Sequence, residues 1–309
     1  MTSHSDSSIL MQLLLAVQRL YASAPSGRDD LPTALPWLSL VRRATPTAVG
    51  RGMLQPSVCL LVQGDKEMLV GERVLRYGPG AYVQAAMPIP VSGRIVRASE
   101  AEPYYGIRID LDPKEVAAFI LEMELPVPSE RDETPVVTVE PAADALLEAF
   151  LRLLRLSDRA RERDLAVLGR LIKQEIMYYL VTAPGGITLT RGILGGKREY
   201  AVGRAISWIR QHYDEPLNVS SLAQSVHLSP SVLHRRFKAA TVMSPLQYQK
   251  QVRLLEARKL LMSGGVEAAS VAYEVGYESP SQFSREYRRL FGASPIQDAQ
   301  QLRGHAPEP

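Results

Sequence analysis

The sequence predicts an α+β protein, with an N-terminal β-sandwich or small barrel flanked by helices and an all-α C-terminal domain of two helix-turn-helix motifs joined by a long helix. Two observations support this prediction. Short β-rich runs separated by glycine fill residues 37–111, a spacing typical of a β-sandwich or a small barrel. A helical pattern then begins at Ser221 and recurs at Ser270. A chain of 309 residues is long enough to bury two separate cores.

The composition is that of a soluble globular protein, with 46% apolar and 22% charged residues. The positive charge is concentrated in the C-terminal third, where residues 200–309 contain 13 Lys and Arg against nine Asp and Glu. Residues 1–199 contain 23 Lys and Arg against 24 Asp and Glu. This asymmetry favours a polyanionic partner for the C-terminal part.

The apolar stretch Ile9–Val17 is too short to cross a membrane and is interrupted by Gln12. No Lys or Arg precedes it, as the start of a signal peptide would require. We therefore expect a cytoplasmic protein with no membrane partner. Cys59 is the only cysteine, which excludes an intrachain disulfide and a cysteine-rich metal site.

The N-terminal elements can be placed in chain order. Residues 1–8 are polar and expected to be disordered, whereas residues 9–22 have helical periodicity. The expected strands are Val58–Gln63, Glu67–Val70, Arg73–Tyr77, Ala81–Gln84, Val91–Val96 and Tyr105–Leu111. The expected helices that follow are Pro113–Leu121, Ala142–Leu156 and Asp164–Val181. We interpret the charged stretch 158–163 as a solvated connection between the last two helices.

A domain linker is expected within residues 183–198, which contain five glycines and little periodicity. The predicted division is an N-terminal domain at 1–184, a linker at 185–199 and a C-terminal domain at 200–303. Everything beyond the linker has a helical pattern.

The two copies of the C-terminal pattern align at an offset of 49 residues, and of 50 after one insertion at Glu278. Each copy reads as a helix, a tight turn and a second helix. Ser229 and Ser279 are expected to be N-caps, each followed by a proline at the first helical position, Pro230 or Pro280. The start of both second helices is therefore well defined.

The turn of each motif is also predicted. Ala223 and Ala272 lie midway along the first helices, where a small side chain lets the second helix cross closely. Gly276 fills the turn of the second copy and tolerates a positive φ. His227 takes that position in the first copy, which is allowed for histidine.

The second helices are amphipathic. Leu233 and Phe237 share one face of the first, as Phe283, Tyr287 and Leu290 do in the second, and both faces are expected in the core. The opposite faces carry Ser231, His234, Arg235 and Lys238, and Ser281, Ser284, Arg285 and Arg288. A capped second helix with an outward basic face fits a helix-turn-helix that enters the major groove of DNA. A plain helical bundle with a solvated basic face would not explain why the pattern occurs twice.

The segment between the two motifs supports this interpretation. Residues 244–262 form a continuous helical pattern of roughly 19 residues, or about 28 Å. A rigid helix of that length can hold two recognition helices about one DNA turn apart, near ~34 Å. A single chain would then read an asymmetric DNA site.

The C-terminal region closely resembles the DNA-binding domain of the AraC/XylS family of transcriptional regulators. The matching segments are LAQSVHLSPSVLHRRFK, SPLQYQKQVRLLEARKLL and AYEVGYESPSQFSREYRRLFGASP, within residues 200–303. The resemblance implies that the base-facing positions are Ser231, His234, Arg235, Pro280, Ser281 and Arg285. We expect Arg235 and Arg285 to contact guanine, and Lys238 and Arg288 to contact phosphate. Tyr287 replaces the usual phenylalanine, so its hydroxyl needs a partner.

The N-terminal region resembles one branch of the same family. The segments are PSVCLLVQGDKEMLVGERVLRYGPGAYVQAAMPIPVSG and IKQEIMYYLVTAPGG. This resemblance implies a cupin-like β-barrel that senses an effector, followed by helices used for dimerisation. It also implies RNA polymerase as a partner. The apolar residues of 142–156 and 164–181 are expected to have a mixed role, with part of one face forming a homodimer interface.

A metal-dependent enzyme is excluded for the barrel, because its metal site would need two or three histidines. The five histidines are His4, His212, His227, His234 and His305, and none lies in the barrel region. No nucleophile elbow, phosphate-binding loop or dinucleotide fingerprint occurs either, so we expect neither catalysis nor a cofactor. An apolar barrel interior suits a small organic effector.

Cys59 offers a second hypothesis for sensing, a thiol that reacts with an electrophile or an oxidant. The simpler interpretation is an inert residue buried in the core. Two classes of function therefore stay open for the whole chain. One is an effector-controlled, sequence-specific transcriptional regulator; the other is a constitutive or architectural DNA-binding protein whose barrel only dimerises.

Overall fold

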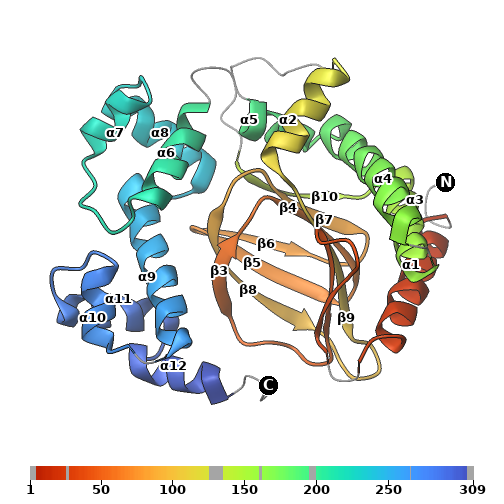
Figure 1. Cartoon of the computed structure of the whole chain (residues 1–309), viewed down its shortest axis with the longest axis horizontal. Helices are drawn as coiled ribbons and strands as arrows, with labels where there is room; N and C mark the ends of the chain where they lie inside the picture. Colours follow the sequence, from red (N-terminus) through yellow and green to blue (C-terminus); the bar gives the residue numbers. More distant parts are fainter. Residues whose placement is uncertain are drawn as a thin grey trace. The chain divides into compact units, whose positions relative to one another are not determined.

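The computed structural model describes residues 5–25, 28–124, 135–159, 162–194, 200–264 and 266–304 (Figure 1). The chain separates into two compact units, divided between Tyr200 and Ala201. Residues 51–53 group with the second unit, and the rest of the chain before Ala201 forms the first. Within the described ranges, no helix is long and apolar enough to cross a membrane.

The first unit contains two β-sheets. The six-stranded sheet has the order β1 (Asp30–Pro32), β2 (Leu38–Arg43), β9 (Tyr104–Asp110), β4 (Ser57–Gln63), β7 (Ala81–Ala85) and β10 (Val137–Pro141). The four-stranded sheet has the order β3 (Gly50–Leu54), β8 (Ile89–Arg97), β5 (Asp65–Val70) and β6 (Arg73–Tyr77). Neighbours in the first sheet run antiparallel, as does β5 with both of its partners.

All six strands expected from the sequence are present, and the α+β class is confirmed; of the two architectures expected for the strands, the sandwich describes them better than a barrel. The strands form two separate sheets that face each other, not one sheet closed on itself (Figure 1). Periodicity and turn residues locate a strand along the chain, but they do not say which strand it pairs with. The short strand β1 and the distant strand β10 form the edges of the larger sheet, and neither was predicted.

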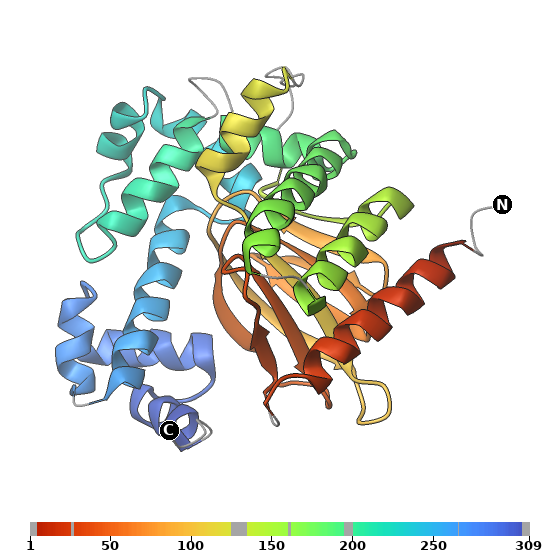
Figure 2. The same ribbon diagram turned by 45° about the vertical axis from the view of Figure 1, so that its right-hand side comes forward.

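Helices cover the outer face of the six-stranded sheet (Figures 1 and 2). They are α1 (Ser5–Ala22), α3 (Asp144–Arg159) and α4 (Glu162–Thr182). The expected helices at 9–22, 142–156 and 164–181 are thus confirmed, although α1 begins at Ser5, within a segment expected to be disordered. Leu13 and Phe150 are fully buried in this layer, because each lies on the apolar stripe of its helix.

Two shorter helices complete the first unit. Helix α2 (Pro113–Glu122) was predicted, and the side chain of Asp112 caps it by accepting from the Lys114 amide at 2.8 Å. Helix α5 (Gly186–Leu194) lies in the segment expected to be a linker and was not predicted. The buried side chain of Gln84 donates a 2.6 Å hydrogen bond to the Gly185 carbonyl, which ties the start of α5 to the sheet.

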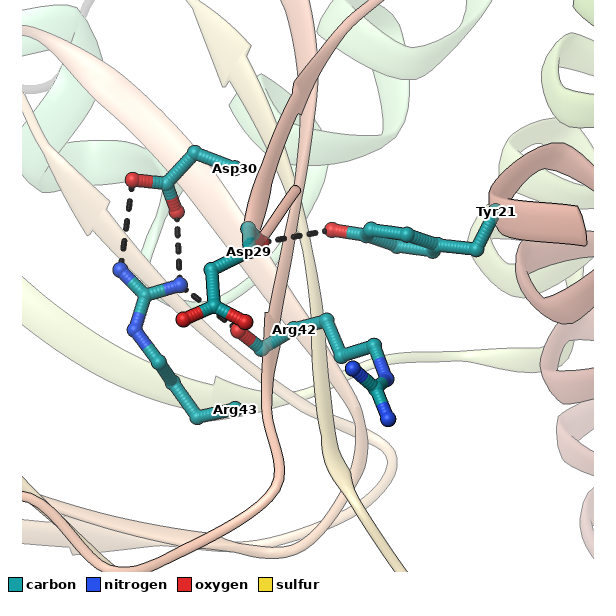
Figure 3. Close-up of polar contacts among 5 residues, drawn as sticks. All are labelled: Tyr21, Asp29, Asp30, Arg42 and Arg43. Atoms are coloured by element: carbon teal, nitrogen blue, oxygen red, sulfur yellow. Dashed lines mark hydrogen bonds and ion pairs between the residues drawn. The ribbon is translucent and has the colours of Figure 1, made fainter. Parts of the chain in front are cut away.

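Polar contacts fix the end of α1 to the edge of the sheet (Figure 3). The Tyr21 hydroxyl donates a 2.9 Å hydrogen bond to the Asp29 carbonyl. On the neighbouring strands, the guanidinium of Arg43 in β2 binds both carboxylate oxygens of Asp30 in β1, at 2.8 and 3.2 Å. The Tyr21 ring also packs on Tyr105 of β9, with ring centroids 5.7 Å apart.

Within residues 201–264 and 266–304 of the second unit, helices are the regular secondary structure and no strand occurs. Its helices are α6 (Tyr200–Gln211), α7 (Val219–Ser225), α8 (Pro230–Thr241), α9 (Pro245–Ser263), α10 (Ala268–Glu274), α11 (Pro280–Phe291) and α12 (Pro295–Gly304). The pairs α7–α8 and α10–α11 are the two predicted helix-turn-helix motifs. Helix α9, which joins them, has 19 residues, as the sequence predicted.

Candidate nucleic-acid interface

The second helix of each motif begins as predicted. The backbone amide of Val232 donates to the Ser229 hydroxyl at 3.4 Å, and the amide of Gln282 donates to Ser279 at the same distance. Both serines have an extended backbone, and a proline occupies the first helical position of α8 and of α11. The two helices are therefore capped in the same way.

The turns also have the predicted geometry. His227 has a φ of 60° and Gly276 a φ of 85°, both in the left-handed region. Ala223 and Ala272 are fully buried. At Gly276 a Cβ atom would lie 2.0 Å from the Asp214 carbonyl oxygen, so the turn requires glycine for space as well as for φ.

The apolar faces of α8 and α11 point into the core. Leu233 and Phe237 of α8 are fully buried, as are Phe283 and Tyr287 of α11. Leu290 is half-buried at the edge of the second cluster. Because each helix has one buried face, its opposite face must point to solvent.

These opposite faces carry most of the predicted DNA contacts. The exposed residues are Ser231, His234, Arg235 and Lys238 on α8, and Ser281, Arg285 and Arg288 on α11. Pro280 and Ser284 are half-buried. The spacing of three and four residues aligns each set along one side of its helix. Among the described residues, no hydrogen bond or ion pair engages the side chains of Lys238, Arg285 and Arg288, which leaves their charges available for a polyanion.

Arg253 of α9 was not predicted, yet it joins segments on both sides of α9. Its guanidinium donates to the carbonyls of Tyr213 at 2.5 Å, Gly276 at 2.6 Å and Glu215 at 2.8 Å. The first and last of these follow α6, and Gly276 is the turn of the second motif. The buried Gln249, one helical turn earlier, donates to Glu215 at 2.8 Å. The signal available in the sequence was the spacing of Gln249 and Arg253, since two polar residues four apart share one face of a helix.

The hydroxyl of Tyr287 has the partner that the sequence required. It donates to Oδ2 of Asp298 at 2.8 Å, while Arg258 binds both oxygens of that carboxylate at 2.7 and 2.9 Å. Burial and the hydrogen bond to Asp298 raise the pKa of Tyr287 well above its usual value. This cluster links α9, α11 and α12.

Cys59 lies in the first unit, on β4, and so belongs to a different site from the basic helix faces. Its side chain is half-buried. Within the described ranges, no group of three histidine, cysteine or acidic side chains is placed to hold a metal ion. His4 and His305 lie outside those ranges.

A duplicated helix-turn-helix with solvated basic faces is the framework of a DNA-binding protein, and the comparisons specify which kind. Residues 34–188 match the family of AraC-type transcriptional regulator N-termini, and residues 222–301 match a helix-turn-helix domain. The chain belongs to the AraC/XylS family of transcriptional regulators. It thus combines the N-terminal unit of that family with a helix-turn-helix domain.

Among curated proteins, the chain is similar to the transcriptional activator RhaS. It is 32% identical to RhaS of Pectobacterium carotovorum over 100 residues, covering 32% of this chain and 36% of that protein. It is 33% identical to RhaS of Escherichia coli strain SE11 over 90 residues, covering 29% and 32%. The matched part is thus about a third of the length of these relatives.

Among solved structures, the fold is similar to that of ToxT from Vibrio cholerae. The crystal structure of ToxT from strain O395 has a TM-score of 0.54 at 9% identity, over 86% of this chain and 98% of that chain. ToxT bound to (E)-4-(8-methylnaphthalen-1-yl)but-3-enoic acid has a TM-score of 0.51 at 11% identity, with the same coverage. At these identities the likeness shows the fold.

Proposed function

We propose that the protein is a sequence-specific transcriptional regulator that reads an asymmetric DNA site with two recognition helices, under the control of an effector in the N-terminal unit. The observation that carries this proposal is the duplication of a capped helix with an exposed arginine at the same position, Arg235 in α8 and Arg285 in α11. Guanine recognition by arginine is the commonest specific contact in the major groove.

The other side chains of the two faces have assigned roles in this proposal. Ser231 and His234 meet base edges beside Arg235, and Pro280 and Ser281 do so beside Arg285. Lys238 and Arg288 lie further along the two helices and bind phosphate, which positions the protein without reading sequence. RNA polymerase is the proposed protein partner, on the ground of family membership.

Effector control rests on the architecture of the first unit. Two facing sheets can hold a small molecule between them, and in one ToxT structure a small organic acid is bound. The effector would favour either the DNA-competent or the incompetent arrangement through its different affinity for the two. We keep Cys59 as a proposed effector contact or reactive thiol, and an unchanged response in Cys59→Ser would eliminate the thiol reaction.

A homodimer is proposed through α4. Four of its large apolar side chains are exposed, namely Val167, Leu168, Leu171 and Tyr178. On the same helix Ile176 is fully buried, so one face of α4 packs within the first unit and the exposed face is left for the proposed interface. An exposed apolar stripe on a helix is suited to a second copy of the same helix. Sedimentation at micromolar concentration that gives only monomer, with and without DNA, would contradict this interface.

Selection of random-sequence duplexes by the full-length protein tests the reading of DNA. We expect an enriched asymmetric site with two blocks about ten base pairs apart. The enrichment should weaken at one block in Arg235→Ala and at the other in Arg285→Ala. Binding that depends steeply on salt but enriches no sequence would favour the constitutive, architectural alternative.

A further inference from the structure

The inward face of the four-stranded sheet contains a lysine among apolar side chains. Side chains alternate along β5, so Lys66 shares its face with Met68, which is 3% exposed. The cross-strand partners of Lys66 are Tyr77 on β6 and Ile95 on β8, and both are buried. A charged group in such a wall is costly unless something compensates its charge.

The acidic neighbours of Lys66 do not provide that compensation. Asp65 and Glu67 flank it in the sequence, and each bonds an arginine outside the face of Lys66. Asp65 pairs with Arg97 at 2.5 Å, and Glu67 pairs with Arg76 at 2.8 Å. Among the described residues, no hydrogen bond or ion pair engages the ammonium group of Lys66.

The six-stranded sheet faces Lys66 with two arginines and one cysteine. Cys59 of β4 and Arg108 of β9 are partners in register, and both interact electrostatically with Lys66. Arg43 of β2 does so as well. Burial is the largest influence and lowers the pKa of Lys66; Cys59 and Asp30 raise it, Arg108 and Arg43 lower it, and the pKa stays below its usual value. The space between the sheets therefore has an excess of positive charge on this side.

Both arginines already have a carboxylate partner. Arg108 binds Asp110 at 2.7 Å, and Arg43 binds Asp30, as Figure 3 shows. Lys66 is the cation of this group that lacks one within the described residues. A single uncompensated positive charge is suited to a ligand with one negative charge. The two negative charges of a phosphate dianion would exceed it.

A buried hydroxyl beside Lys66 also lacks a partner. The hydroxyl of Tyr77 is buried and makes no hydrogen bond within the described structure. Burial raises the pKa of Tyr77 well above its usual value, so this hydroxyl remains a donor. A buried donor without a partner destabilises the fold, and an acceptor from a ligand would remove that cost. Lys66 and Tyr77 are neighbours in register, so one carboxylate can accept from both.

Access to these groups is not fully closed. Lys66, Cys59 and Arg108 are each half-buried although their strands place them between the two sheets. We propose that this inward surface of the first unit binds an organic monocarboxylate. The carboxylate accepts hydrogen bonds from Lys66 and Tyr77, and the apolar part of the ligand lies against the wall that includes Met68. This inference deepens the proposed function, because the carboxylate would be the effector.

Thermal unfolding of the full-length protein tests the carboxylate site. The probes are sodium butanoate, hexanoate and octanoate at constant ionic strength, each compared with the alcohol of the same length. We expect at least one carboxylate to raise the melting temperature by several degrees more than its alcohol. No such difference in the whole series would overturn the inference.

Single substitutions test which residues are responsible for the stabilisation by carboxylate. Lys66→Met should raise the melting temperature of the ligand-free protein, because it removes an uncompensated charge, and should abolish the shift by carboxylate. Tyr77→Phe should reduce that shift, and it preserves the packing if the lysine variant fails to fold. Lys114→Met, at an exposed position on α2, should keep it. A full shift in both Lys66→Met and Tyr77→Phe would contradict the proposed site.

DNA affinity measured on the same samples separates this inference from the proposed function. The expected result is that carboxylate raises the melting temperature in a way that depends on Lys66 and also changes the affinity for DNA. The same shift with unchanged DNA affinity would support the anion site and count against effector control. Specific DNA binding without any carboxylate shift would overturn the inference and leave DNA reading intact.

Discussion

The hydroxyl of Tyr287 on α11 donates a 2.8 Å hydrogen bond to Asp298 on α12, and the same carboxylate is held by Arg258 of α9. Asp298 is 5% exposed, so its charge is compensated by these two partners and not by water. The contact sets the position of the second recognition helix relative to the long helix, and therefore the position of Arg285.

Tyr287→Phe should lower the free energy of unfolding by about 1–2 kcal/mol, because it leaves a buried carboxylate with one donor fewer. Urea unfolding of the full-length protein, followed by a signal from the second unit, measures this change in the free energy of unfolding. Tyr273→Phe is the matched control, since Tyr273 is 60% exposed and should change stability by less than about 0.5 kcal/mol. Equal effects of the two substitutions would show that the hydroxyl of Tyr287 contributes nothing.

Arg253→Lys should destabilise the protein by about 2–3 kcal/mol, because an ammonium group cannot reach three carbonyls as the planar guanidinium does. DNA affinity should fall as well, since the turn at Gly276 loses its link to α9. Chemical denaturation and DNA titration measure the two effects. Arg210→Lys, at an exposed position on α6, should change neither.

The two recognition helices end in the left-handed region, at Val242 with a φ of 59° and at Gly292 with a φ of 85°. A β-branched residue is strained there, so Val242→Gly should stabilise the protein by about 1 kcal/mol. The reciprocal change Gly292→Val should destabilise it by about 1–2 kcal/mol through the backbone alone, because no atom lies within 4 Å of an added Cβ. Melting temperatures that move in the same direction for both variants would contradict this account.

Glu286 gives the second motif a dependence on pH. Burial alone would raise the pKa of Glu286, but hydrogen bonds from Lys250, Tyr277 and Gln282 lower it below its usual value of 4.5. A depressed pKa means that the carboxylate stabilises the fold above the unfolded value and loses this contribution as the pH falls through the folded value. The stability difference between the wild type and Glu286→Gln should be constant near neutral pH and shrink below pH 4.5. A difference that grows in acid would refute the assignment.

The sequence predicted the second unit better than the first, for a physical reason. Caps, prolines and a left-handed turn act within a few residues, so Ser229, Gly276 and their counterparts could be read from the chain alone. The apolar stripes then determined which side of α8 and α11 faces solvent. The partner of Tyr287 was expected, but not its identity, because Asp298 is brought near by the path of the chain through α12.

The first unit depended on long-range pairing, which local patterns do not contain. Each predicted strand exists, but the sequence did not predict how the strands divide into two sheets, and β10 joins the larger sheet from a segment far along the chain. Helix α5 was not predicted because its glycines are typical of a linker, whereas tertiary contacts hold it as a helix. The inward position of Lys66 was not predicted, because Asp65 and Glu67 flank it in the sequence. Only the register shows that Lys66 faces inward and that these two residues do not.

The most direct test of the central claim compares two kinds of variant on the selected DNA site. Arg235→Ala and Arg285→Ala should each lose about 1–3 kcal/mol of affinity for the selected site and almost none for random DNA. Lys238→Ala and Arg288→Ala should weaken both affinities alike and reduce the salt dependence by about one phosphate contact. Parallel losses on both DNAs for all four variants would contradict base reading by α8 and α11.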